Sequence, residues 1–324
     1  MINRSDVLQA QNRISGHVRR TPLLRGGTAA APLWFKCEFL QHTGVFKARG
    51  AFNRQLAARE RGELDPAVGV VAASGGNAGL ANAYAAAALG LPATVFIPKN
   101  APRIKVERLL AYNATVRQVG TEYAEAFAAA MDYVEDTGAL FCHAYDQLEI
   151  AAGAGTLAEE ILEDEPGIDT IVVAVGGGGL YAGVAAAAEG RARVVAVEPF
   201  TIPTLHAALD AGRPVDVAVS GVAADSLGAR RVGGIAFSIA SRVPPASVLV
   251  DDAAIVAARS QLWSDYRIPA EYGAAAAFAA LTSGAYTPAA GERVAVIVCG
   301  ANTDACTLEN DPAAIDQGRL NSAG

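Results

Sequence analysis

The fold is decided by residues 170–198, which read TIVVAVGGGGLYAGVAAAAEGRARVVAVE. Residues 170–175 form a continuous apolar run, typical of a strand that is buried on both faces of a parallel sheet. Four glycines at 176–179 then turn into an alanine-rich helix expected over 180–189, and a second apolar strand is expected over 194–197. A strand, a glycine turn, a helix and a second strand in this order predict an α/β fold with mostly parallel strands.

The same alternation continues on both sides of this unit. Short β-branched runs predict strands over 68–73, 93–97, 114–119 and 294–298. Longer stretches between them predict helices, for example over 121–137. No linker or low-complexity tract divides the chain, so two lobes formed by an insertion fit the pattern, and sequence alone does not place their boundary sharply.

Composition excludes several classes of protein. Of the 324 residues, 52% are hydrophobic and 18% are charged, which excludes a disordered chain. The net charge is −7 and no basic block is long, so we expect no nucleic-acid partner. The polar residues 1–13 predict no secretory signal, and the cysteines lack metal-ligand spacing. Breaks at 90–92 and 282–284 interrupt the two longest alanine-rich stretches, so we expect no membrane span. Because no secretory signal is predicted, we expect a cytoplasmic location.

The glycine run at 176–179 is the most informative single motif. Glycine lets backbone N–H groups approach an anion at the start of a helix. Two interpretations stay open, because Gly177, Gly179 and Gly183, with Glu198 at the end of the next strand, also fit a dinucleotide-binding fingerprint. A nucleotide-dependent oxidoreductase is therefore one candidate function. It leaves two other motifs unexplained.

These two motifs are GVFKARG at 44–50, which contains Lys47, and SGGNAG at 74–79. Each is weak alone, because a lysine among apolar residues usually lies at the surface and Ser-Gly-Gly-Asn is usually a turn. Together with the glycine run, they resemble the serine/threonine dehydratase family of pyridoxal-phosphate enzymes. That family has the tryptophan-synthase-β-like fold (fold type II). The nearest likeness is to its L-serine dehydratase branch.

The resemblance covers nearly the whole chain, in matching order and spacing. Its other motifs are RTPL at 20–23, AGAGT at 152–156, VEP at 197–199, EYGAA at 271–275 and VCG at 298–300. The resemblance implies two lobes, each with a mostly parallel sheet flanked by helices. The large cofactor-binding domain would comprise residues 1–62 and 147–324, and the small domain would comprise residues 63–146. We also expect a homodimer.

Lys47 resembles the lysine that forms the Schiff base with pyridoxal phosphate in this family. Its neighbours Val45 and Phe46 are apolar, and they would desolvate the amine and lower its pKa. A lowered pKa favours the neutral, nucleophilic amine. Once the substrate has displaced it, this amine is expected to take the α-proton of the substrate.

The resemblance assigns the remaining contacts of the site. Asn77 would bond the ring hydroxyl of the cofactor, Phe46 and Ser226 would cover the two ring faces, and Glu271 also belongs to the cofactor site. The phosphate would be held by the segment Gly176, Gly177, Gly178, Gly179 and Leu180. The substrate carboxylate would be bound by Ser74 and its neighbours Gly75, Gly76 and Asn77.

Cys299 is the expected partner of the pyridine nitrogen. A thiol forms only a weak hydrogen bond there and should leave this nitrogen unprotonated. The ring is then a weaker electron sink, which suits β-elimination better than chemistry that needs a long-lived carbanion. Taken alone, Cys299 at a strand end is an ordinary buried cysteine.

At two positions the sequence differs from the family pattern, and these differences bear on the expected reaction and on the expected cation. Members that racemise serine have a catalytic serine two positions before the asparagine, and here that position is Gly75. Elimination is therefore expected over racemisation. A family cation site maps onto Glu198, Ile202 and Thr204, and members that prefer a divalent ion have an aspartate in place of Thr204. A single carboxylate suits potassium, although Glu198 could instead cap a helix or pair with an arginine.

The sequence thus predicts an L-serine/L-threonine ammonia-lyase that acts on a small amino-acid substrate. The runner-up is a dehydratase of another β-hydroxy-amino acid, such as 3-hydroxyaspartate or a β-substituted serine. A β-replacement enzyme and a non-catalytic cofactor-binding protein are weaker alternatives. Ala48, Arg49 and the region near Arg230 are candidates for the residues that select the substrate. The chain is short after Cys299, so we expect no appended regulatory domain.

Overall fold

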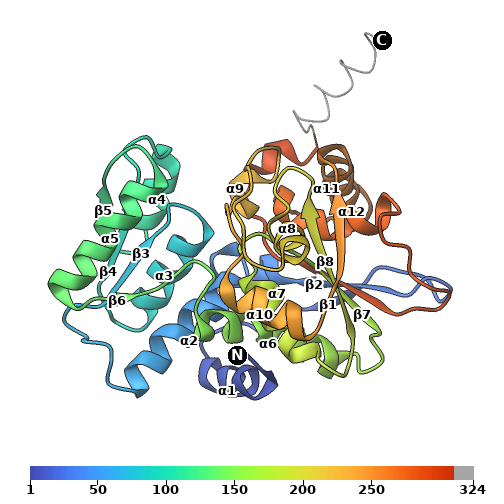
Figure 1. Cartoon of the computed structure of the whole chain (residues 1–324), viewed down its shortest axis with the longest axis horizontal. Helices are drawn as coiled ribbons and strands as arrows, with labels where there is room; N and C mark the ends of the chain where they lie inside the picture. The colour runs from blue at the N-terminus through green and yellow to red at the C-terminus, as the bar shows by residue number, and fades with distance from the viewer. Residues whose placement is uncertain (310–324) are drawn as a thin grey trace, which may run out of the picture.

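The large sheet of the computed structural model has six strands in the order β1-β2-β10-β7-β8-β9. All neighbouring strands in it are parallel except β1 and β2. The structure describes residues 1–309. The six strands are β1 Leu23–Arg25, β2 Leu33–Cys37, β7 Thr170–Ala174, β8 Arg193–Pro199, β9 Ala246–Val250 and β10 Val294–Val298. Figure 1 shows this sheet in the part of the molecule that also contains both ends of the described chain.

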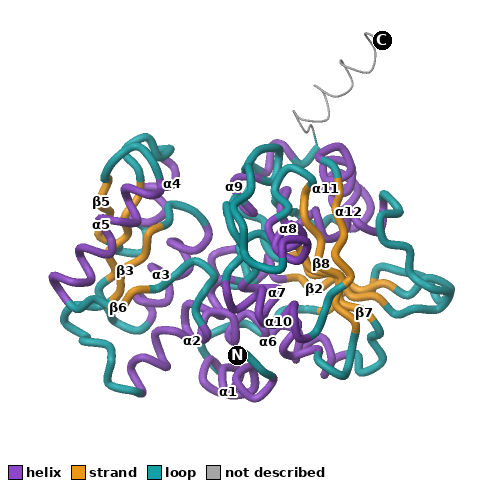
Figure 2. Tube along the Cα trace, in the orientation of Figure 1, coloured by secondary structure: helices purple, strands orange, loops and turns teal. Residues whose placement is uncertain are grey.

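The second sheet is all-parallel, with the order β5-β4-β3-β6. Its strands are β3 Val70–Ala73, β4 Ala93–Ile97, β5 Thr115–Gln118 and β6 Leu140–Phe141. They lie within residues 70–141, inside the stretch 63–146 that the sequence assigns to a small domain. This sheet and its helices stand apart from the six-stranded sheet, and α2 runs between the two parts (Figures 1 and 2).

Helices flank both sheets, as expected for an α/β fold of mostly parallel strands. Those of the part with the smaller sheet are α3 Asn77–Ala88, α4 Arg103–Leu110 and α5 Tyr123–Thr137. Those of the larger part are α1 Arg4–Ile14, α2 Lys47–Glu60, α6 Leu148–Asp164, α7 Gly179–Ala188, α8 Thr204–Ala211, α9 Ala224–Leu227, α10 Gly234–Arg242, α11 Asp252–Tyr266 and α12 Tyr272–Thr282. Three short 3-10 helices are η1 Glu38–Leu40, η2 His42–Gly44 and η3 Ala305–Thr307. No helix within residues 1–309 is long and apolar enough to cross a membrane.

Glycines let α2, α6 and α7 approach one another closely. A Cβ added to Gly153 of α6 would lie 2.5 Å from the carbonyl oxygen of Arg49, and one on Gly155 would lie 2.5 Å from that of Gly183. The AGAGT motif is therefore the contact by which α6 packs on both neighbours. Since α2 begins at Lys47 and α7 begins within the glycine run, this packing positions the lysine relative to that run.

Arg49 lies in a fully buried ion network below the N-terminus of α2. Its guanidinium donates to Glu38 at 2.8 Å and to Glu160 at 2.7 Å, and Lys36 donates to the same Glu160. Neither Ala48 nor Arg49 lines the cavity described below. Their suggestion as substrate-selecting residues is therefore wrong: Arg49 links α2 to η1 and α6 through Glu38 and Glu160. A lone buried charge would be costly there.

Two elements begin two residues later than expected. The strand expected from 68 begins at Val70, because Gly69 has φ +80° and its N–H bonds the carbonyl of Asp65 in a turn. The helix expected from 121 begins at Tyr123, because the carboxylate of Glu125 accepts the backbone N–H groups of Thr121 and Glu122. These local caps satisfy donors that have no helical partner.

Candidate active site

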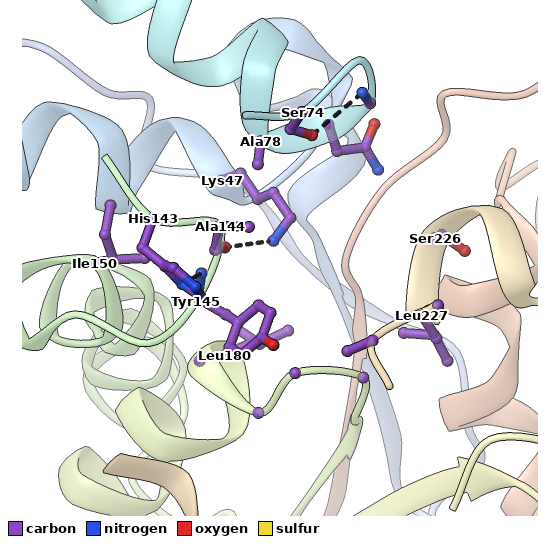
Figure 3. Close-up of a pocket in the computed structure, with 18 of the residues that line it drawn as sticks. Lys47, Ser74, Ala78, His143, Ala144, Tyr145, Ile150, Leu180, Ser226 and Leu227 are labelled. Atoms are coloured by element: carbon purple, nitrogen blue, oxygen red, sulfur yellow. Dashed lines mark hydrogen bonds between the residues drawn. The ribbon is translucent and has the colours of Figure 1, made fainter. Parts of the chain in front are cut away.

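Lys47 is half-buried at the first turn of α2, with its amine in a cavity between the two parts of the molecule. Its Nζ donates to the carbonyl oxygen of Ala144 at 3.1 Å and lies 5.0 Å from the ring centre of Phe46 (Figure 3). Val45 is fully buried beside it. Burial lowers the pKa of Lys47. Its only hydrogen-bond acceptor among residues 1–309 is a neutral carbonyl, so the surroundings favour an uncharged amine.

The glycine run lies between β7 and α7 and lines the same cavity. Gly178 is the N-cap of α7 with φ +88°, a conformation that side chains rarely adopt. A Cβ on Gly177 would lie 2.3 Å from the ring of Tyr145. Within residues 1–309, the N–H groups of Gly176, Gly177 and Gly178 have no hydrogen-bond partner. Unpaired N–H groups at a helix N-terminus form a binding site for an anion such as phosphate.

The SGGNAG motif forms the turn from β3 into α3. The Ser74 hydroxyl accepts the N–H of Gly76 at 3.3 Å, and Asn77 is the first residue of α3. The Asn77 amide donates to both carboxylate oxygens of Glu271, at 3.0 and 3.1 Å. Burial raises the pKa of Glu271 to about 7. This turn, which follows a strand of the smaller sheet, therefore places Asn77 in contact with Glu271 of the larger part.

Cys299 and Ser226 line the opposite side of the cavity. Cys299 follows β10 directly and is buried, and burial raises the pKa of its thiol, so it stays protonated. Ser226 lies in the short helix α9, where its hydroxyl accepts the N–H of Gly273 at 3.1 Å. Cys299 thus lies at the carboxyl end of a parallel strand, where ligands bind in such folds, and Ser226 reaches the same cavity from α9.

The cavity has a volume of about 510 Å³ and gathers most of the residues that the sequence singles out. From that set, the lining comprises Phe46, Lys47, Ser74, Gly76, Asn77, Gly176, Gly177, Gly178, Gly179, Leu180, Ser226, Glu271 and Cys299. Arg230, named as a candidate for substrate selection, also lines it. Gly75 does not line the cavity: a Cβ there would face Ile97 at 3.3 Å.

The residues that line the cavity but are absent from the expected set include Lys105, Tyr123, His143, Tyr145 and Asp225. His143 and Tyr145 follow β6, whose carboxyl end shares a sheet edge with that of β3, so strand order could have indicated them. The Nδ1 atom of His143 accepts the N–H groups of Tyr145 and Asp146, at 3.1 and 2.8 Å. This leaves Nε2 as the nitrogen that carries the proton of a neutral ring.

Lys105 and Asp225 link the two parts of the molecule at the cavity. The Lys105 amine of α4 lies 2.5 Å from the Asp225 carboxylate of α9. The ion pair is largely exposed and contributes little to stability. No sequence motif marks either residue, because their contact depends on how the two parts sit together.

The predicted cation ligands lie outside this cavity. The Glu198 carboxylate accepts the N–H groups of Leu205 at 2.7 Å and His206 at 2.8 Å, and it contacts the Thr204 hydroxyl at 2.9 Å. Glu198 therefore caps α8, the alternative role that the sequence left open. Within residues 1–309, no group of three or more His, Cys, Asp or Glu side chains could hold a metal ion. The potassium site formed with Ile202 stays a prediction.

Residues 14–300 match the family model described as pyridoxal-phosphate dependent enzyme. The chain belongs to this family. It is 36% identical over 309 residues to an L-threonine ammonia-lyase of Geobacter sulfurreducens, covering 93% of this chain and 76% of the relative. It is 35% identical to a phenylserine dehydratase of Ralstonia pickettii, and the alignment covers 91% of this chain and 92% of the relative. The structure of serine racemase from Dictyostelium discoideum aligns with a TM-score of 0.86 at 30% identity. The alignment covers 94% of this chain and 99% of the racemase chain.

Family membership confirms the expected fold and the expected cofactor, pyridoxal phosphate. The relatives also confirm the enzyme class, a pyridoxal-phosphate-dependent lyase. The nucleotide-dependent oxidoreductase suggested by residues 170–198 is therefore wrong, because the chain belongs to a family of pyridoxal-phosphate enzymes. The residues present fit this cofactor, since one cavity is lined by a desolvated amine and by backbone N–H groups that have no partner in the described part of the chain.

The stability of the cofactor-free enzyme should depend on pH through Glu271. Its pKa is about 7 in the folded state, above the ordinary value of 4.5, so the folded chain retains a proton that the unfolded chain releases. The resulting stabilisation is complete below pH 4.5 and is lost as the pH rises through 7, by up to about 3 kcal/mol. Between pH 5 and pH 8, the free energy of unfolding measured with urea should therefore fall more for the wild type than for Glu271→Gln. Equal drops would contradict this assignment.

Proposed function

We propose that this enzyme is an L-threonine/L-serine ammonia-lyase, which releases a 2-oxo acid and ammonia by α,β-elimination. The observation that carries the proposal is the pairing of Lys47 with the glycine run in one cavity. Within residues 1–309, the lysine amine is bonded only to a neutral carbonyl, and the N–H groups of Gly176, Gly177 and Gly178 are unpaired. A reactive amine beside a phosphate site is what pyridoxal-phosphate chemistry requires.

The cofactor would be held by residues from both parts of the molecule. Lys47 would bind it covalently, the segment 176–180 would bind its phosphate, and Asn77 would bond its ring oxygen. Cys299 would face the pyridine nitrogen, and Phe46 and Ser226 would cover the ring faces. Glu271 would support Asn77. The substrate carboxylate would lie against the turn of Ser74, Gly76 and Asn77, at the start of α3, where a helix N-terminus favours negative charge.

When bound, pyridoxal phosphate withdraws electrons from the bond between the α-carbon and its hydrogen. The neutral amine of Lys47 would accept the α-proton at Nζ, and the β-hydroxyl would leave as water with a second proton, which the phosphate of the bound cofactor would supply. The Ala144 carbonyl keeps Nζ on the cavity side of α2 before it reacts. The protonated Cys299 supplies at most a weak hydrogen bond to the ring nitrogen, which suits a reaction in which the leaving group takes the electrons.

A substrate panel tests the proposed function. Release of 2-oxo acid and ammonia should be measured with L-threonine, L-serine, 3-hydroxyaspartate and 3-phenylserine, with potassium present and with sodium in its place. We expect the highest kcat/KM with L-threonine or L-serine. A wild-type enzyme that binds the cofactor but releases no 2-oxo acid from any of the four would contradict the proposal. Faster turnover with potassium would support a cation site at Glu198.

A dehydratase of a β-substituted serine is the second candidate. It is favoured by the aromatic side chains of Tyr123 and Tyr145, which line the cavity along with Ile150 and Leu180. Figure 3 shows Tyr145, Ile150 and Leu180 near Lys47. A higher kcat/KM for 3-phenylserine than for L-threonine would select this candidate.

We expect no racemisation of L-serine, because Gly75 provides no second proton-transfer group. The wild type should form no D-serine above the enzyme-free control in a chiral assay. Gly75→Ser should not create racemase activity either, since the Cβ at this position faces Ile97 and not the cavity. D-serine formation by the wild type would contradict the one-base site, and D-serine formation by Gly75→Ser alone would contradict the orientation of residue 75. A homodimer and a cytoplasmic location stay predictions.

A further inference from the structure

Asn302 lies just behind the cavity and contacts the cofactor-binding asparagine. Its Nδ2 donates to the Oδ1 atom of Asn77 at 2.7 Å and to the carbonyl oxygen of Thr43 at 2.9 Å. Asn302 itself does not line the cavity. It comes from the loop after β10, in the larger part, whereas Asn77 begins α3 in the part with the smaller sheet.

The partners of this pair determine which way each amide points. Thr43 offers a carbonyl oxygen, which only accepts, so the Asn302 atom beside it must be the NH2 group. The second hydrogen of that NH2 group reaches Asn77, which must therefore present its oxygen. The NH2 group of Asn77 then faces Glu271, whose two carboxylate oxygens it contacts at 3.0 and 3.1 Å. A flipped Asn77 amide would place its oxygen against this carboxylate.

The anchor at Thr43 has an unusual backbone conformation. Thr43 has φ 63° and ψ 10°, a left-handed conformation that is rare for a β-branched residue. Its hydroxyl is buried without a hydrogen-bond partner among residues 1–309. Strain of this kind persists only where surrounding contacts enforce it, and it is concentrated near functional sites. Here the turn directs the Thr43 carbonyl towards Asn302, four residues before Lys47.

We propose that Asn302 is a positioning residue that fixes the amide of Asn77 so that it presents an N–H group to the ring oxygen of pyridoxal phosphate. The Asn77 NH2 group contacts both oxygens of Glu271, and Asn77 itself lines the cavity. Without Asn302, Glu271 alone holds the Asn77 amide, so the flipped amide, whose oxygen faces and repels the cofactor oxygen, becomes more populated. This inference rests on the proposed function, because it requires the cofactor to bind at Lys47 with its ring beside Asn77.

Asn302→Asp tests the proposal with almost no change in size. A carboxylate cannot donate to Thr43 or to Asn77, so the Asn77 amide should turn its NH2 group towards residue 302. Loss of a hydrogen bond to a charged ring oxygen should weaken pyridoxal-phosphate binding by about 10- to 100-fold. It should also shift the visible absorption band of the lysine-bound cofactor, a spectroscopic change that a general loss of stability does not produce.

The matched control is Asn53→Asp. Asn53 also holds two hydrogen bonds, donating to the Glu149 carbonyl at 2.7 Å and accepting from Arg13 at 2.8 Å, but it does not line the cavity. It should keep the wild-type cofactor affinity and spectrum. Asn302→Ser, which retains one donor in a smaller side chain, provides a second variant if Asn302→Asp does not fold, and it should shift the band in the same way.

The outcomes separate the two proposals. A folded Asn302 variant with the wild-type affinity and spectrum would overturn the role of Asn302 and leave the proposed function standing. A wild-type enzyme whose bound cofactor is not linked to Lys47 would overturn both. A changed spectrum in the Asn302 variants, together with an unchanged spectrum in Asn53→Asp, supports the inference.

Discussion

Replacing Lys47 with alanine should lower kcat/KM for L-threonine by roughly 10⁴-fold or more, since the variant lacks the proposed base at the α-carbon. The same variant loses the covalent link to the cofactor, so its yellow colour should wash out on dialysis. Lys47→Arg should be as inactive as Lys47→Ala, because a guanidinium stays charged and can neither accept the α-proton nor form the Schiff base. The measurement is 2-oxo acid release at saturating pyridoxal phosphate.

The matched control is Lys99→Ala, which removes an exposed lysine outside the cavity and should retain wild-type kcat/KM. Circular dichroism and thermal unfolding of all three variants separate loss of chemistry from loss of folding. A Lys47→Ala enzyme that keeps even a tenth of the wild-type kcat/KM would show that another group takes the α-proton, and the one-base account would then fail.

Gly177→Ala should abolish stable cofactor binding. The added Cβ would lie 2.3 Å from the Tyr145 ring, so the loop or the ring must move into the space that the phosphate needs. Each charge-assisted hydrogen bond from the backbone to the phosphate contributes about 1.5–3 kcal/mol, and losing two of them weakens binding on the order of 100-fold or more. Equilibrium dialysis against pyridoxal phosphate measures this change.

Gly234→Ala is the matched control for this substitution. Gly234 is also the first residue of a helix, and a Cβ there would lie 3.8 Å from the Asp146 carboxylate, an ordinary contact. The control should bind the cofactor with wild-type affinity. If Gly177→Ala binds it equally well, the glycine run is not the phosphate site, and the anion site must be sought elsewhere in the cavity.

The sequence could predict what depends on local order along the chain. The apolar strand 170–175, the glycines after it and the helix that follows are neighbours in sequence, so their spacing alone indicates an anion site at a helix start. Lys47 is different, because nothing around it marks it as special. Its assignment depended on the presence of the asparagine turn and Cys299 elsewhere in the same sequence. The structure places all of these residues in one cavity.

The remaining features depend on contacts between distant segments. Arg49 is two residues from Lys47, yet its helical position points it into the ion network with Glu38 and Glu160. Asn302 is 225 residues from Asn77 and meets it only through the arrangement of the two parts. No periodicity or spacing rule contains that information, since a hydrogen bond between two loops is set by the tertiary structure.

Glu198 shows a second limit of sequence reasoning. A carboxylate after a parallel strand could hold a cation or cap the next helix, and both uses need the same residue at the same place. The structure shows it bonded to the N–H groups of Leu205 and His206. The geometry of α8 decides this contact, and the sequence of α8 does not reveal it.

Borohydride reduction of the purified, cofactor-loaded enzyme, followed by peptide mapping with mass spectrometry, tests the central claim most directly. Reduction makes the bond between pyridoxal phosphate and its lysine permanent. The account predicts a pyridoxyl-phosphate adduct on the peptide that contains Lys47, with no comparable label on the peptides of Lys36, Lys99 or Lys105. An adduct on a different lysine, or no adduct on a protein that binds the cofactor, would contradict it.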